Sequence, residues 1–227
     1  MAEAVSSGKH HVMRSTVVFV FLLAARPVAA APVSGVVQTT VRQGTTAAQA
    51  VVYAEPLDRP AIPKALKVSL TQKNKSFSPD VLGVPVGSTI EFPNGDPIFH
   101  NVFSLSAPAP FDLGLYRAGA SKARVFSAPA TYRVFCNIHP QMMALVVVVP
   151  TPFVTVTGND GRFTLDLPPG TYRLTVVSGR AAPAVKEVAV PPAGLRVEDL
   201  ALDERPFRDE PHKNKFGKEY PREAYNR

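Results

Sequence analysis

Short runs of β-branched residues, separated by proline and glycine, constrain this chain more than any other feature. Its 227 residues include 23 prolines, 14 glycines and no tryptophan. Valine recurs in short runs, of which residues 146–149 are the longest. Frequent turn formers interrupt long helices, whereas β-branched side chains fit a pleated strand. The pattern therefore predicts an all-β protein.

The strand pattern divides the chain into blocks. Residues 31–63 contain two strand-like pieces and then a proline-bearing stretch. Residues 64–150 contain a series of short strands and form the largest block, which ends at Pro150. Residues 151–203 alternate between apolar and polar side chains, as half-buried strands do. Two β-rich domains account for these blocks.

Turn and tail signals complete the outline. Asn159, Asp160 and Gly161 form a hairpin turn signal between two strand-like runs. Residues 204–227 are dense in charge and nearly free of aliphatic side chains. Such a segment buries little apolar surface, so we expect a flexible charged tail there.

The N-terminus is typical of an export signal. Arg14 precedes an apolar run at residues 16–25, and small residues follow that run. A charged start, a short apolar stretch and an A-x-A-like end characterise a secretory signal peptide. The apolar run has about half the length that a membrane-spanning helix needs. We therefore predict a signal peptide over residues 1–30, starting at Met1 or Met13. The mature protein is then periplasmic or secreted, with no transmembrane segment.

The charge distribution argues against a nucleic-acid partner. The chain carries a formal charge of +7, but its basic residues are scattered and are not interleaved with aromatic residues. Proteins that bind nucleic acid usually gather such residues in a patch or stripe. The sequence also contains a single cysteine, Cys136, so no disulfide can form within the chain.

Metal-binding side chains are concentrated in residues 135–142, which read FCNIHPQM. Cys136, His139 and Met142 follow a C-x2-H-x2-M spacing at the end of a β-rich run. A thiolate, an imidazole and a thioether are soft to borderline ligands. With a second imidazole they form the ligand set of mononuclear blue-copper electron-transfer sites. His100 can supply that imidazole from a neighbouring strand.

Each of these residues alone has an ordinary structural explanation. Cys136 could be a buried core residue, and Met142 could fill a gap in the core. The joint spacing favours copper, since a lone thiol in an exported protein is prone to oxidation unless it is buried or metal-bound. For the axial position the spacing favours Met142, with the adjacent Met143 as the alternative. A site with four protein ligands leaves no open position for catalysis, so we do not expect an enzyme.

Two other functions are compatible with this pattern. The first is copper storage, delivery or sensing, although such sites are often richer in methionine and histidine; Met143 is the one feature that favours it. The second is a structural or interaction module in which copper stabilises one domain. The intense colour of a type 1 copper–thiolate centre would distinguish an electron carrier from both.

Residues 64–150 resemble the cupredoxins, in particular those of the plastocyanin and amicyanin type. The resemblance rests on residues 77–92, which contain F-S-P and then V-P-V-G-S-T-I-E-F, on residues 94–102, and on the short ligand loop. It implies a Greek-key β-sandwich. The ligands that it implies for one type 1 copper are three equatorial residues and an axial methionine, namely His100, Cys136, His139 and Met142. It also implies that Asn101 hydrogen-bonds near the cysteine and ties the two ligand loops together.

Residues 151–203 resemble a second family, the carboxypeptidase regulatory-like or transthyretin-like β-sandwich. The match lies in residues 159–172, whereas the opening strands of that family correspond to residues 33–37 and 50–53. Those strands precede the cupredoxin-like block. We therefore favour insertion of residues 64–150 into the smaller sandwich, over a tandem in which the N-terminal strands complete the cupredoxin-like sandwich. The whole chain resembles exported proteins called methylamine utilization proteins.

The cupredoxin resemblance also implies redox proteins as partners, either a c-type cytochrome or a dehydrogenase. In cupredoxins the loop histidine is partly exposed amid apolar surface. We therefore expect His139 at the surface beside Pro140, where a partner could dock and accept an electron. Residues 111–117 look like an extra loop that could cover part of this face. The sequence does not indicate the oligomeric state.

Overall fold

The computed structural model describes residues 29–208 and 212–220. This part of the chain consists of strands, turns and irregular segments, which confirms the all-β prediction. None of its residues belongs to a helix that is long and apolar enough to cross a bilayer. The predicted signal peptide, residues 1–30, lies almost entirely outside the described residues.

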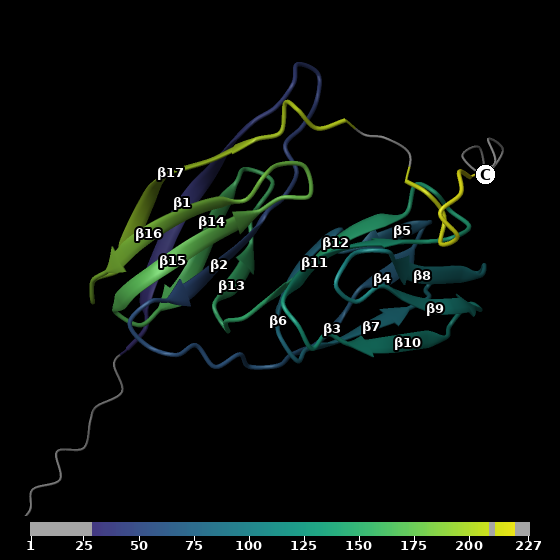
Figure 1. The fold of residues 1–227 in the computed structure, drawn as a ribbon, viewed down its shortest axis with the longest axis horizontal. Helices are drawn as coiled ribbons and strands as arrows, with labels where there is room; N and C mark the ends of the chain where they lie inside the picture. Colours follow the sequence, from purple (N-terminus) through teal and green to yellow (C-terminus); the bar gives the residue numbers. More distant parts are fainter. Residues whose placement is uncertain (1–28, 209–211, 221–227) are drawn as a thin grey trace, which may run out of the picture.

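Two β-sandwiches lie side by side in Figure 1. The first, called the split sandwich, combines strands from both ends of the described chain. Its strands are β1 (Ala31–Thr40), β2 (Val51–Pro56), β13 (Val154–Val156), β14 (Arg162–Leu167), β15 (Gly170–Val177), β16 (Ala184–Val190) and β17 (Leu195–Asp203). They form two sheets, ordered β14-β1-β17 and β13-β2-β15-β16.

The second unit, called the inserted sandwich, lies between β2 and β13 in the sequence. Its strands are β3 (Lys67–Ser69), β4 (Thr71–Lys73), β5 (Ser76–Ser78), β6 (Val81–Pro85), β7 (Thr89–Pro93), β8 (His100–Ser104), β9 (Phe111–Tyr116), β10 (Ser121–Val125), β11 (Ala130–Phe135) and β12 (Met143–Val149). The larger sheet has the order β6-β12-β11-β8-β9, and a smaller sheet has the order β10-β7-β3. Most of the segment that we expected to form an extra loop is strand β9, which pairs with β8.

The pairing of β1 decides between insertion and tandem arrangement. β1 pairs antiparallel with β14 and parallel with β17, and β2 pairs antiparallel with β13 and β15. Val33, for example, lies opposite both Leu165 and Leu195. The N-terminal strands therefore complete the split sandwich, as insertion requires.

Alternating side chains build a separate core in each sandwich. In β14, Phe163, Leu165 and Leu167 are buried while the residues between them are exposed. β12 differs because six of its seven residues are buried. Successive strand residues face opposite sides of a sheet. Ala144, Val146 and Val148 therefore join the core of the inserted sandwich, whereas Leu145, Val147 and Val149 pack with Val51 and Val177 of the split sandwich. The valine run thus forms part of the contact between the two sandwiches.

The turn at residues 159–161 has a different role from the one its sequence predicts. A turn forms there, with Gly161 at φ +76°. The flanking strands β13 and β14 do not form a hairpin, because β13 pairs with β2 and β14 pairs with β1. The chain therefore changes sheets at this turn. Local turn chemistry specifies the change of direction but not the strand that is paired next.

The described parts of the C-terminal segment differ from the expected flexible tail. Glu204 is buried, and its carboxylate accepts hydrogen bonds from Ser178 Oγ at 2.6 Å and from the backbone N–H of Ala48 at 3.2 Å. Residues 212–220, called the strap, lie at the end of the inserted sandwich that is farther from the split sandwich, in yellow in Figure 1. Tyr220, within the strap, is buried. The charge-rich composition predicted exposure because it carries no information about these specific partners.

Candidate metal centre

The predicted ligands lie at or near the ends of strands of the larger sheet. His100 is the first residue of β8, and Cys136 follows the last residue of β11. These two strands pair, with Phe135 opposite Phe103. His139 lies in the loop after Cys136, and Met142 immediately precedes β12. The sheet therefore brings His100 to the Cys136–Met142 loop.

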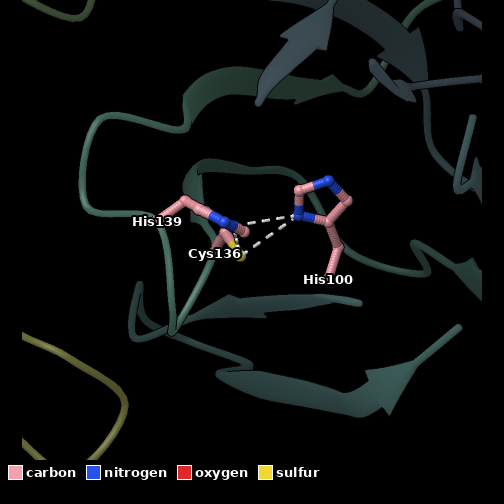
Figure 2. A group of neighbouring side chains, drawn as sticks. All are labelled: His100, Cys136 and His139. Atoms are coloured by element: carbon pink, nitrogen blue, oxygen red, sulfur yellow. Dashed lines mark hydrogen bonds between the residues drawn. The ribbon is translucent and has the colours of Figure 1, made fainter. Parts of the chain in front are cut away.

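Three of the predicted ligands converge on one point. The Nδ1 atom of His100 lies 3.8 Å from the Cys136 sulfur, and the Nδ1 atom of His139 lies 3.6 Å from it. The two Nδ1 atoms are 3.1 Å apart. Figure 2 shows the two rings and the thiol facing one another. All three residues are buried, and together they form the group of possible metal ligands within the described residues.

These distances fit a shared metal ion. Protein ligands bind a transition metal at about 2.0 Å through nitrogen and about 2.3 Å through sulfur, which separates the ligand atoms of one ion by roughly 3.3–3.8 Å. The two nitrogen–sulfur distances lie in this range, and the nitrogen–nitrogen distance is slightly shorter. Two imidazoles and one thiol suit copper or zinc by donor chemistry.

The two adjacent methionines have different environments. Met142 is fully buried and shares the core of the inserted sandwich with Cys136. Met143 is 44% exposed. The backbone N–H of Met142 donates to the carbonyl of His139 at 3.0 Å, which closes the loop beneath the donors. Of the two, Met142 is therefore the one whose side chain lies in the same core as Cys136.

Asn101 hydrogen-bonds to the cysteine, as the cupredoxin resemblance implies, but it does so through its backbone. Its backbone N–H is a hydrogen-bond donor to the Cys136 sulfur. Its side-chain amide donates to Oδ1 of Asp112 on β9 at 2.7 Å, rather than to the cysteine loop. The residue after the cysteine, Asn137, accepts instead a hydrogen bond from the backbone of Lys215 in the strap, at 3.0 Å. Asn101 thus contacts the cysteine through its backbone and β9 through its side chain.

Burial has opposite effects on the proton affinities of Cys136 and His139. It raises the pKa of the Cys136 thiol, while hydrogen bonds from the backbone N–H groups of Asn101, Ile138 and His139 act in the opposite direction. Burial lowers the pKa of His139, and the nearby His100 lowers it further. A neutral imidazole is the form that binds a metal, so the environment of His139 favours ligation.

Asp96 belongs to the candidate site, although the sequence analysis assigned it no role. Its carboxylate Oδ2 lies 2.8 Å from Nε2 of His100, and both side chains are buried. Burial favours the neutral acid, but hydrogen bonds from the backbone of Lys75, from His100 and from the backbone of Asn74 outweigh it and hold the pKa of Asp96 below its usual value. A carboxylate there accepts the Nε2 proton of His100 and leaves Nδ1 free for a metal.

His139 is less accessible than expected. We expected it at the surface, but only 8% of it is exposed. Residues on both sides of it, Asn137 and Pro140, accept hydrogen bonds from the strap. The hydrogen bonds on either side of His139 therefore come from the C-terminal segment.

Comparison with known proteins gives matches at the level of structure. Neither the protein-family models nor the curated protein sequences contain a match to this chain. A copper-containing nitrite reductase from Thermus scotoductus SA-01 aligns with 29% identity over 41% of this chain and 26% of its own, at a TM-score of 0.36. A purple cupredoxin from Nitrosopumilus maritimus aligns with 26% identity over 38% of this chain and 100% of its own, at a TM-score of 0.33.

A Cu(I) form of an amicyanin variant aligns with 21% identity over 43% of this chain and 99% of its own, at a TM-score of 0.35. The cupredoxin and the amicyanin are thus matched along nearly their whole length. This chain spans about a quarter of the length of the nitrite reductase. Each match leaves more than half of this chain without a counterpart.

Proposed function

We propose that this chain is an exported copper protein that carries single electrons between redox partners. Three residues, His100, Cys136 and His139, would hold one mononuclear type 1 copper, with Met142 as a weak axial ligand. The observation that carries the proposal is the convergence of two Nδ1 atoms and one thiol on a single buried point. This donor set is the one that blue-copper electron-transfer sites use.

Copper, when bound, supplies a one-electron couple between Cu(II) and Cu(I). The chain's own residues hold the donors so that little rearrangement accompanies a change of charge. β8 and Asp96 fix His100, and the end of β11 fixes Cys136. The burial of the donors excludes water from them. Ligands on strands and short loops keep their geometry better than ligands on long loops.

The burial of the donors favours electron transfer over delivery. Delivery requires the metal to exchange with a partner, whereas buried donors retain it. With Met142 as a fourth ligand no open coordination position is left, so we also propose that the chain is not an enzyme. Export through residues 1–30, and a c-type cytochrome or a dehydrogenase as partner, stay predictions.

We propose further that the inserted sandwich is of the cupredoxin type and that the split sandwich is of the transthyretin-like type. The pairing of β1 and β2 with β13, β14, β15 and β17 supports this division. The motif in residues 159–172 supports the second assignment.

The experiment compares copper binding and redox activity of the wild type, Cys136→Ala and Met143→Leu. We expect one copper per chain and a reversible one-electron wave in voltammetry for the wild type. Cys136→Ala should lose the wave and most of the affinity, and Met143→Leu should keep both. Several coppers per chain, or the same wave from Cys136→Ala, would contradict the proposal.

A further inference from the structure

The strap contacts the backbone of the ligand loop directly. The hydroxyl of Tyr220 donates to the carbonyl of Cys136 at 2.9 Å, and Tyr220 is buried. Nε2 of His212 lies 2.6 Å from the carbonyl of Pro140. Because a carbonyl only accepts, this ring nitrogen carries a proton and donates. The strap therefore holds the loop on both sides of His139.

Ring packing adds to these hydrogen bonds. The imidazole of His212 stacks on the ring of Phe135, with 3.9 Å between centroids and 24° between the planes. Tyr220 meets the same imidazole edge-on at 5.2 Å. Phe135 immediately precedes Cys136, so the stack lies against the residue from which the ligand loop begins.

A third attachment reaches the strand that carries His100. Nζ of Lys215 lies 2.6 Å from Oδ2 of Asp112, whose Oδ1 accepts the side-chain amide of Asn101. Burial favours the neutral form of Asp112, but the bonds from Lys215 and Asn101 outweigh it and hold the pKa of that carboxyl below its usual value. The strap is therefore linked to both ligand-bearing segments.

We propose that the strap positions the ligand loop and occupies the face over His139 where a redox partner would otherwise dock. His212 and Tyr220 are its positioning residues. The outer side of the strap exposes different groups, Lys213, Lys218 and Phe216, of which Phe216 is 71% exposed. A partner must therefore displace the strap or exchange electrons across it. The blocking of a docking face rests on the proposed electron-transfer function, whereas the positioning of the ligand loop does not.

The test uses Cys136, the single thiol of the chain, as a reporter in the full-length, copper-free protein. The measurement is the rate at which a bulky aromatic disulfide reagent labels it. The variants are Tyr220→Phe, His212→Ala and their combination, with Lys213→Gln as the control on the same strap. Loss of one net hydrogen bond shifts a local opening equilibrium by about fivefold. We expect labelling to accelerate by about fivefold in Tyr220→Phe and by about tenfold to thirtyfold in the combined variant, with no change in the control.

Wild-type labelling rates in both Tyr220→Phe and the combined variant would overturn the proposal, as would an equal acceleration in Lys213→Gln. Tyr220→Phe removes a single oxygen atom, so it keeps the test valid if the combined variant folds poorly. Electron self-exchange of the copper-loaded protein provides the second measurement. We expect faster exchange in the combined variant, and an unchanged rate beside accelerated labelling would overturn the docking part alone. Because the labelling needs no copper, failure of the strap and failure of the copper assignment give different results.

Discussion

At the residue scale, the bond between Asp96 and His100 determines which nitrogen of the imidazole faces the site. Nε2 is committed to the carboxylate and Nδ1 to the other donors. The backbone N–H groups of Asn74 and Lys75 hold the carboxylate in place at 2.6 Å and 2.9 Å. Such supporting bonds orient a ligand and raise its basicity.

We predict that Asp96→Asn weakens copper binding by roughly tenfold to a hundredfold, because an amide cannot hold the ring in place as a carboxylate does. Competition with a chelator of known affinity measures the change. Asp160→Asn is the matched control, since Asp160 is exposed and distant in sequence from the donors. Equal affinities for Asp96→Asn and Asp160→Asn would refute the role of Asp96.

The two methionines allow a matched comparison. Met142→Leu should raise the reduction potential while copper is retained, because loss of a weak thioether donor disfavours Cu(II). The volume-conserving change should cost under about 1.5 kcal/mol of stability. Met143→Leu should leave the potential unchanged, because Met143 is exposed. Voltammetry of both variants decides, and a shift confined to Met143→Leu would reverse the assignment.

The four proposed ligands could be predicted from residue types and spacing, whereas their surroundings could not. The residues of the C-x2-H-x2-M motif are close together in the sequence, so this part of the ligand set can be recognised without knowledge of the fold. The role of Asp96 depends on its burial beside residues 74–75 from another segment. The hydrogen bonds on either side of His139 come from residues more than 70 positions away.

At the element scale, the positions of the strands followed from the residue pattern, whereas the pairing of β13 and β14 did not. The N-terminal strands and the valine run of β12 lie close to the predicted positions. The turn between β13 and β14 looked like a hairpin because two-residue turn chemistry is local. Its flanking strands join different sheets, since β13 pairs with β2 and β14 pairs with β1.

We predict that Gly161→Ala destabilises the protein by about 2–4 kcal/mol. Gly161 has φ +76°, and an added Cβ would lie 2.4 Å from the carbonyl oxygen of Val37 on β1. Gly44 is the control, since it has φ +80° but no atom within 4 Å of such a Cβ. Gly44→Ala should therefore cost only the conformational strain, about 1–2 kcal/mol. Chemical denaturation measures both, and equal losses would argue against the contact with β1.

At the scale of the whole molecule, the two sandwiches share an apolar contact. Leu145, Val147 and Val149 of β12 pack with Val51 and Val177 across it. The guanidinium of Arg133 donates to the carbonyl of Gly179 at 2.6 Å. We infer that the sandwiches stabilise each other, since separation would expose this apolar surface to water.

Gly83→Ala should weaken this contact. An added Cβ would lie 2.7 Å from Val154 and 2.8 Å from Val51, both on the split sandwich. Overpacking of this kind costs about 1–3 kcal/mol. Gly179→Ala is the control, because its Cβ would meet Leu145 across the same contact at an ordinary 3.6 Å. A lower free energy of unfolding for Gly83→Ala than for Gly179→Ala is the expected result, and identical values would show that the sandwiches tolerate separation there.

The account depends on one thiolate-ligated copper, and the visible and electron paramagnetic resonance spectra of the copper-loaded wild type test this most directly. We predict an intense blue or green band from charge transfer between the Cys136 thiolate and Cu(II), together with the small copper hyperfine splitting of a type 1 centre. A nearly colourless protein with the large splitting of a tetragonal Cu(II) site would contradict the account, because the thiolate would then not be a ligand.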